Sequence, residues 1–280
     1  MKHNLSLSRK NILKTLSAAL LAVAATACSD VEPADRFIPV DGEEPQRAVL
    51  LEDYTGQNCI NCPGAHEVID LLVEQYPGAV IPVSIHAGNF GVSTARTSYE
   101  RGYVGLMQPE GTPMADAWGI NSFPMGVIDR RGTPQESDSW AAAVRDRISV
   151  PSVLEIEGEA STDPAASRLD ISLVFKPAED VKGTLHIWVV EDGIVAFQRN
   201  GSTRVPDYVH NNVYRASVNT LEGEPIDLEA HVHSSLTRSI EIRNTDTERW
   251  NPDRLRVVAF VQDAAGVVQA MQAPASKTLE

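Results

Sequence analysis

Two cysteines separated by two residues, Cys59 and Cys62, are the feature that most constrains how this chain can fold. Residues 47–54 ahead of the pair read as a buried strand, and residues 65–76 carry apolar side chains at helical spacing. Pro63 fits the first turn of such a helix, because its missing N–H would have no partner there. The pattern therefore predicts a Cys-x-x-Cys pair where a helix begins, directly after a strand.

That position has a chemical meaning. Unpaired backbone N–H groups and the helix dipole favour an anion at a helix N-terminus, and a thiolate is such an anion. Two intervening residues let both sulfurs meet within one helical turn. We expect Cys59 to be the more exposed sulfur, which attacks a disulfide, and Cys62 to resolve the mixed disulfide.

Two further segments resemble parts of the thioredoxin fold. Residues 49–54 (VLLEDY) resemble the strand before the active site, and residues 117–129 (AWGINSFPMGVID) resemble the segment that leads into the cis-proline strand. The resemblance implies that Asp53, six residues before Cys59, is a buried acid that assists proton transfer. It also implies that Pro124 is a cis-proline whose strand edge docks an extended peptide.

The chain also departs from the thioredoxin pattern. Thr55 and Asn58 stand where thioredoxins carry tryptophans, and residues 87–117 insert a Gly-rich, polar segment. Residues 136–149 read as a closing helix. We therefore expect a thioredoxin-like α/β domain over residues 47–150.

The first residues have the pattern of a secretory signal. Residues 1–14 hold four basic side chains and no acid, and residues 15–27 are small and apolar. The end of this stretch resembles the lipobox of bacterial lipoproteins, which implies cleavage before Cys28 and its lipidation. A cleaved signal with a chance cysteine is the alternative. Residues 28–46 follow as an acidic tether, and the lipid bilayer is the expected partner of the acylated Cys28.

Cysteine count and charge limit the remaining possibilities. The chain has three cysteines, so a lipid-bearing Cys28 leaves only Cys59 and Cys62 and no odd thiol. Its 280 residues carry 38 acidic and 24 basic side chains, a net charge of −14. This excess of negative charge argues against nucleic acid as a partner.

From residue 151 the apolar pattern changes to a period of two, with turn signals at 163–164 and at 182–183. Several short alternating strands predict an all-β, Ig-like sandwich domain over residues 151–280. This segment shows no catalytic constellation, and we expect no cofactor and no bound metal.

The whole arrangement resembles the outer membrane protein 28-related lipoproteins of Gram-negative bacteria. The recognisable pieces are Thr55-Gly56 before the Cys-x-x-Cys-Pro motif, Ser122-Phe123-Pro124, His210-Asn211-Asn212-Val213, and residues 257–263 (VVAFVQD). The resemblance implies an outer membrane lipoprotein, periplasmic or surface-exposed, with a thioredoxin-like domain and a C-terminal β-sandwich.

Three functional interpretations follow. The first is an envelope thiol–disulfide oxidoreductase that acts on a protein or peptide disulfide, with Cys59, Cys62, Asp53 and Pro124 as its site. The second is a surface binding or adhesion lipoprotein that keeps a redox-silent thioredoxin-like scaffold. The third is metal handling by Cys59, Cys62 and His66, whose spacing places three ligands within about one helical turn.

Overall fold

The computed structural model describes residues 47–163 and 165–277. The predicted signal peptide, Cys28 and the tether lie outside these residues. The described helices are α2 (Cys62–Gln75), α3 (Gly111–Ala117) and α4 (Trp140–Ile148), with short 3-10 turns η2 (Gly88–Phe90), η3 (Thr94–Arg96), η4 (Tyr99–Arg101), η5 (Ser137–Ser139) and η6 (Pro252–Arg254). The strands are β1 (Val49–Thr55), β2 (Val80–His86), β3 (Met125–Ile128), β4 (Leu154–Asp163), β5 (Arg168–Pro177), β6 (Val181–Glu191), β7 (Ile194–Asn200), β8 (Thr203–His210), β9 (Val213–Ser217), β10 (Glu224–Leu228), β11 (Ser234–Glu241), β12 (Leu255–Asp263) and β13 (Gly266–Lys277).

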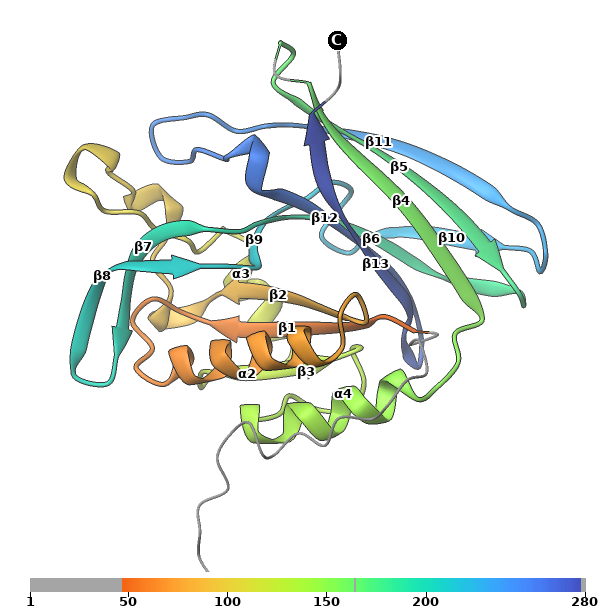
Figure 1. Ribbon diagram of the computed structural model, residues 1–280, viewed down its shortest axis with the longest axis horizontal. Helices are drawn as coiled ribbons and strands as arrows, with labels where there is room; N and C mark the ends of the chain where they lie inside the picture. Colours follow the sequence, from red (N-terminus) through yellow and green to blue (C-terminus); the bar gives the residue numbers. More distant parts are fainter. Residues whose placement is uncertain (1–46, 164, 278–280) are drawn as a thin grey trace, which may run out of the picture. The chain divides into compact units, whose positions relative to one another are not determined.

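Eleven of these strands form one mixed sheet, and β7 and β8 form a separate two-stranded ribbon. The order in the sheet is β11-β5-β4-β13-β12-β6-β9-β2-β1-β3, and β10 pairs with β6 (Figure 1). β1 runs parallel to β2 and antiparallel to β3. β2 meets β9 at one parallel pair, Ser84 with Val213, where the Ser84 N–H donates to the Asn212 carbonyl at 2.6 Å. The early and late strands therefore belong to one sheet.

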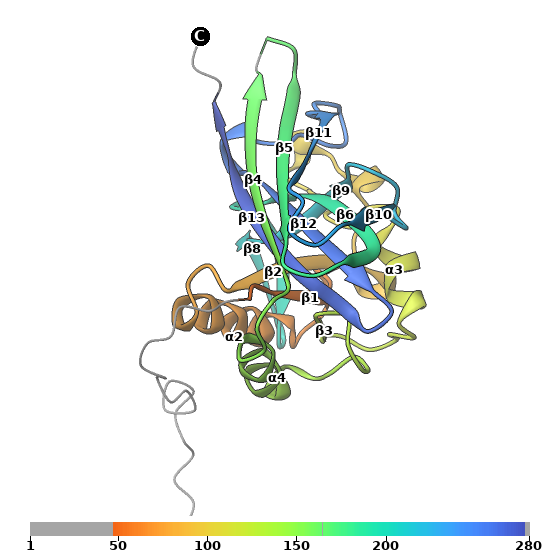
Figure 2. The same ribbon diagram turned by 90° about the vertical axis from the view of Figure 1, so that its right-hand side faces the viewer.

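The first part of the chain is the α/β part. The predicted helix after the cysteines is present, and its buried side chains (Cys62, Pro63, Ala65, Ile69 and Leu72) lie on the face turned to the sheet. α2 and α4 cover one side of β1, while α3 lies on the other side (Figures 1 and 2). The expected strand at residues 79–86 and the closing helix within 136–149 are likewise present, as β2 and α4.

The later strands differ in layering from the expected sandwich. β10, β6, β12, β13, β4, β5 and β11 are joined edge to edge as one run of the sheet, and a single apolar core lies inside it. The two end strands of this run, β10 and β11, approach each other. The Arg238 guanidinium on β11 pairs with the Glu224 carboxylate on β10 at 2.9 Å. These seven strands thus form one curled run of sheet, and the Ig-like sandwich predicted for residues 151–280 stays a prediction. Alternation fixes which face of a strand is buried but not which strands pair.

One expected turn is in fact strand. Lys182 and Gly183 lie inside β6, where Gly183 faces the neighbouring β12. A Cβ at Gly183 would collide with the backbone carbonyl of Gln262. The glycine therefore marks a close approach of two backbones, not a reversal of the chain.

A second apolar core is shared between the two parts of the chain. It joins side chains of β1 and β2, such as Leu50 and Ile81, to side chains of β6 and β12, such as Trp188 and Phe260. The described residues therefore pack continuously across the expected boundary at 150/151. That boundary between two domains stays a prediction.

A buried ion pair lies in this shared core. Glu52 on β1 is fully buried, and its carboxylate accepts from the Arg130 guanidinium at 2.9 Å. Arg130 also donates to the Gln262 side chain at 2.7 Å and lies over the rings of Trp188 and Phe260. One side chain from the α/β part thus holds a carboxylate of β1 and three side chains of the later strands.

We predict that Arg130→Met destabilises the protein by about 3–5 kcal/mol, because it leaves the Glu52 carboxylate buried without a partner. The double variant Glu52→Leu/Arg130→Met should recover much of that loss, since no charge remains buried. Urea unfolding of both variants measures the effect. A single variant as stable as the parent would show that this buried ion pair does not contribute to stability.

Candidate functional site

The Cys-x-x-Cys segment lies where the sequence predicts it. Cys59 and Cys62 form a disulfide with their Cα atoms 5.5 Å apart, and Cys62 is the first residue of α2. Gly56 makes the turn before the pair possible, because a Cβ there would lie 2.5 Å from the carbonyl carbon of Phe90. The Asn58 N–H donates to the Phe90 carbonyl at 2.9 Å and fixes the loop against that residue.

Both cysteines of the disulfide are buried, and Cys59, predicted to be the more exposed of the two, is so only by a small margin. Cys59 is only 2% exposed and Cys62 is 0% exposed. The β7–β8 ribbon lies beside the end of α2 at which the helix begins (Figure 1). Spacing between the cysteines could not reveal this cover, because the ribbon comes from a distant part of the chain.

Hydrogen bonds hold the ribbon on the cysteine loop. The buried Gln198 amide of β7 donates to the carbonyls of Gly56 at 3.3 Å and Cys59 at 2.9 Å. At the turn of the ribbon, the Gly201 N–H donates to the Ile60 carbonyl at 3.0 Å. The ribbon thereby satisfies the loop carbonyls of Gly56, Cys59 and Ile60 before α2.

Gln57 ties the same loop to the inserted segment. Its fully buried amide donates to the carbonyls of Val104 at 2.9 Å and Phe197 at 3.2 Å, and it accepts from the Leu106 N–H at 3.0 Å. The sequence did not single out Gln57 or Gln198. Gln57 lies between Gly56 and Asn58, and Gln198 lies between Phe197 and Arg199, so nothing in the neighbouring residues marks either glutamine as buried.

Pro124 follows a cis peptide bond with Phe123 and directly precedes β3. The Phe123 ring packs edge-on against Phe90 with their centroids 5.6 Å apart. Because Phe90 also accepts from Asn58, the proline segment packs against the residue that borders the cysteine loop. The docking role of Pro124 stays a prediction.

Asp53 lies on the face of β1 opposite to Glu52. It is fully buried, and its Oδ2 atom lies 3.5 Å from His66 Nε2 on α2 and 3.3 Å from Ser84 Oγ on β2. Its Oδ1 atom has no hydrogen-bond partner. Asp53 is thus a buried carboxylate turned towards the helix that carries Cys62, with one oxygen unused.

Two more histidines and a tyrosine lie near His66. His86 and His210 have ring centroids 5.4 Å apart, and Tyr208 packs edge-on against His210 at 4.8 Å. Burial, with the charge of His66 as a second cause, lowers the pKa of His210 to about 3. Burial and the charge of His210 also lower the pKa of His86 well below its ordinary value.

The metal interpretation finds no support in this geometry. His66 Nδ1 contacts the Tyr208 hydroxyl at 2.9 Å, and Nε2 contacts the Thr55 hydroxyl at 3.2 Å. Within residues 47–163 and 165–277, no three His, Cys, Asp or Glu side chains are grouped to hold a metal ion.

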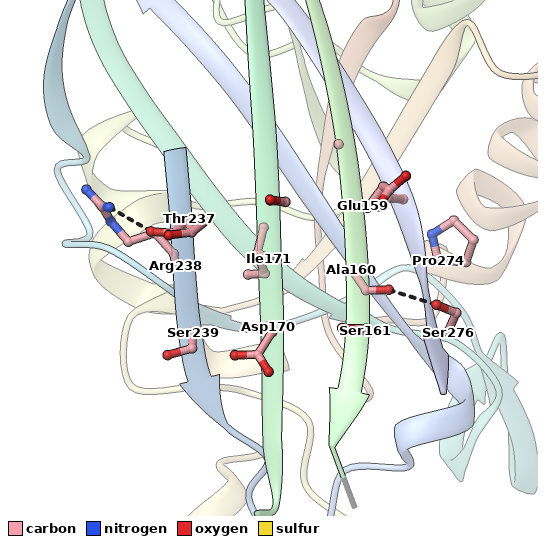
Figure 3. Close-up of a pocket in the computed structure, with 13 residues that line it drawn as sticks. Glu159, Ala160, Ser161, Asp170, Ile171, Thr237, Arg238, Ser239, Pro274 and Ser276 are labelled. Carbon is pink, nitrogen blue, oxygen red and sulfur yellow. Dashed lines mark hydrogen bonds between the residues drawn. The ribbon is translucent and has the colours of Figure 1, made fainter. Parts of the chain in front are cut away.

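A further hollow lies on other strands. It has a volume of about 980 Å³ and lies over β4, β5, β11 and β13, with small and polar side chains such as Ser161, Thr237 and Ser276 in its lining (Figure 3). In sheet order β12, β6, β9 and β2 separate these strands from β1. The hollow is thus distinct from the disulfide site.

The described residues define a mostly β protein with an α/β beginning, a large mixed sheet and a buried Cys-x-x-Cys disulfide. A family model described as outer membrane protein Omp28 matches residues 112–278. The chain belongs to the Omp28 family, which confirms the predicted family and the predicted location at the outer membrane. No described helix is long and apolar enough to cross a membrane.

Two solved structures are similar to this chain at low sequence identity. A protein from Agrobacterium tumefaciens is 15% identical, with 85% of this chain and 98% of that chain covered and a TM-score of 0.47. A domain of the outer membrane lipoprotein Omp28 from Porphyromonas gingivalis is 16% identical, with 46% of this chain and 94% of that chain covered and a TM-score of 0.34. The comparison with curated proteins gives no match.

We predict that Gln198→Ala speeds reduction of the Cys59–Cys62 disulfide by dithiothreitol about tenfold, since one lost buried hydrogen-bonding group costs about 1–3 kcal/mol. Arg199→Ala is the matched control, because the Arg199 side chain is exposed and only its backbone N–H contacts the loop. Equal rates in the two variants would mean that the ribbon does not limit access to the disulfide.

We also predict that stability falls as the medium is acidified. The pKa values of His86, His186 and His210 are lowered in the folded protein, chiefly by burial, to about 3 for the last two. The unfolded chain therefore binds more protons below about pH 6.5, and each histidine costs about 1.4 kcal/mol per pH unit below that value. Stability is fully present above pH 6.5 and is lost as the pH falls towards 3.

Urea midpoints between about pH 7 and 5 measure this loss. In the His210→Gln variant, the slope of the free energy of unfolding against pH should be shallower than in the parent protein, whatever the variant's absolute stability. The exposed His233→Gln should keep the parent slope. Parallel slopes for both variants would contradict the prediction.

Proposed function

We propose that this Omp28-family protein is a cell-envelope lipoprotein whose thioredoxin-like segment, residues 47–150, carries out thiol–disulfide exchange through Cys59 and Cys62. The observation that carries the proposal is the disulfide at the start of α2 with the buried Asp53 beneath that helix. A buried acid under a helix that begins with one of two paired cysteines can take up the proton that exchange releases.

In the reduced protein, the Cys59 thiolate attacks a substrate disulfide, and one substrate thiolate leaves. The Cys62 thiolate then attacks the Cys59 sulfur, the second substrate thiolate leaves, and Asp53 accepts the proton from Cys62. The protein disulfide forms as two electrons pass to the substrate. A thiol reductant of the envelope regenerates the dithiol.

Substrate docking is assigned to the surface beside Pro124. The exposed apolar side chains near the loop are Ile60, 47% exposed, and Phe90, 38% exposed. Phe123 packs on Phe90, so these side chains and the proline segment border the same loop. An extended peptide with apolar residues beside its disulfide fits such a surface.

The anchor completes the proposal. Acylation of Cys28 would hold the protein on the bilayer through its lipid chains, and the acidic tether over residues 28–46 would keep the folded part off the anionic surface. The site then faces either the periplasm or the cell exterior.

A second function is favoured by a different observation. Both cysteines are almost fully buried under the β7–β8 ribbon, as expected for a structural disulfide. On this alternative the protein is a surface binding or adhesion lipoprotein, and the thioredoxin-like segment serves as a redox-silent scaffold.

We predict that the reduced mature chain, carrying Cys28→Ser so that two thiols remain, reduces a small peptide disulfide faster than the same chain with Cys59→Ser. Cys62→Ser should instead accumulate a mixed disulfide with the peptide, because nothing resolves it. Thiol release and mass spectrometry measure both results. If Cys59→Ser is no slower, exchange is excluded.

The reduction potential of the Cys59–Cys62 disulfide distinguishes thiol–disulfide exchange from the redox-silent scaffold. Equilibration of the Cys28→Ser chain with dithiothreitol buffers should give a value in the range of exchange proteins, about −270 to −120 mV. A potential below about −300 mV would instead support the redox-silent scaffold.

A further inference from the structure

A continuous line of polar contacts leads away from the buried carboxylate of Asp53. Asp53 Oδ2 lies 3.5 Å from His66 Nε2, and His66 Nδ1 lies 2.9 Å from the Tyr208 hydroxyl. The three groups come from β1, α2 and β8. The proposed exchange assigns a role to Asp53 but none to His66 or Tyr208.

The inner end of this line lies against the helix that begins with the resolving cysteine. His66 follows Cys62 by four residues on α2, so both side chains lie on one face of the helix. The same face packs over Asp53, whose Oδ1 atom is buried and has no hydrogen-bond partner. A free carboxylate oxygen on this face can accept a proton from the thiol of Cys62.

The outer end reaches a small cavity. His66, Ser84, Tyr208 and Asn212 are among its lining residues, and its volume is about 40 Å³. A single water molecule occupies about 30 Å³ in the liquid, so the cavity has room for one. The His66 side chain is 16% exposed, whereas that of Asp53 is 0% exposed. The line therefore runs from a fully buried acid to a place that water can reach.

The order of donors and acceptors suits proton transfer. An imidazole that gains a proton at Nε2 from Asp53 can release the proton at Nδ1 to the Tyr208 oxygen. Burial, together with the charges of Asp70 and Glu67, raises the pKa of Tyr208 to about 12, so its hydroxyl keeps its proton at neutral pH. The titratable groups that face His66 are Asp53 on β1, His86 on β2, Asp70 on α2, and Tyr208 and His210 on β8.

We propose that His66 and Tyr208 are positioning residues that conduct the proton of Cys62 from Asp53 to the surface cavity during disulfide formation. This inference rests on the proposed exchange function. As Cys62 attacks the mixed disulfide at Cys59, its proton passes to Asp53, then to His66, and leaves by way of the Tyr208 hydroxyl. The ribbon that covers the disulfide thus also supplies the outermost group of the proton path.

The test follows one resolving step. The reduced Cys28→Ser chain is mixed with the aromatic disulfide dithiobis(nitrobenzoate), and coloured nitrothiobenzoate is released twice. The first release reports attack by Cys59, and the second reports attack by Cys62. Cys62→Ser marks the first phase, since it releases only one equivalent.

We expect His66→Asn and Tyr208→Phe to slow the second phase about tenfold or more below pH 7, because a positioned proton carrier speeds proton transfer by at least that factor. The midpoint of the second phase against pH should move upwards, and the first phase should keep its rate. Tyr214→Phe is the matched control, because it removes a hydroxyl that contacts Ser217 at 3.0 Å in the core shared by β1, β2, β6 and β12. That variant should keep the parent profile.

Failure of the exchange function can be distinguished from failure of the proton path. If the parent chain shows no second phase, the exchange function itself is wrong. If the parent resolves normally and both variants follow its pH profile, His66 and Tyr208 conduct no proton and the inference is overturned. An equal slowing of both phases at every pH would mean a purely structural role and would overturn it as well.

Discussion

The joining of the two parts of this protein depends on the contacts of the Arg130 guanidinium. It pairs with the buried Glu52 carboxylate of β1, donates to Gln262 of β12 and covers the aromatic rings behind it. Desolvation of a charge is costly unless partners surround it, and the later strands supply Gln262 and the rings of Trp188 and Phe260 around the Arg130 guanidinium. The sheet itself contributes little at this junction, because β2 and β9 share one residue pair.

The backbone at this point supports the same arrangement. Asp129 and Arg130 are successive non-glycine residues in the left-handed region, with φ values of 49° and 51°. Such a conformation is unfavourable and persists where contacts hold it. The Asp129 carboxylate accepts from the Arg147 guanidinium at 2.8 Å and from the Leu50 N–H at 2.9 Å. Together the two side chains tie β1, α4 and β12 to one turn.

The disulfide site is built from pieces far apart in sequence. The cysteine loop contributes the sulfurs, β1 contributes Asp53, and the β7–β8 ribbon contributes Gln198 and Tyr208. Asn212 connects strands from both parts of the chain. Its carbonyl accepts from the Ser84 N–H of β2, and its side chain accepts from the Arg256 guanidinium of β12. Burial of the disulfide and the presence of a polar path beside it are thus two effects of one ribbon.

Local pattern was enough for the α/β beginning of the chain. A buried run before the cysteines, apolar spacing after them and a proline at the first helical turn predict β1, the disulfide pair and α2, because these signals act between near neighbours. The matching acid at Asp53 and the segment before β3 followed from a resemblance to thioredoxins. The period-two pattern likewise predicted β4, β5, β6 and β12 as strands.

Sequence by itself therefore determined the elements around Cys59 and Cys62, the alternating strands that follow, and the family of the protein. Tertiary structure alone decided that the later strands curl into one sheet, that the α/β part shares its core, and that the ribbon buries the sulfurs. The physical reason is range: helical spacing and turns are fixed by neighbouring residues, whereas strand pairing and burial of Cys59 depend on contacts with residues more than a hundred positions away.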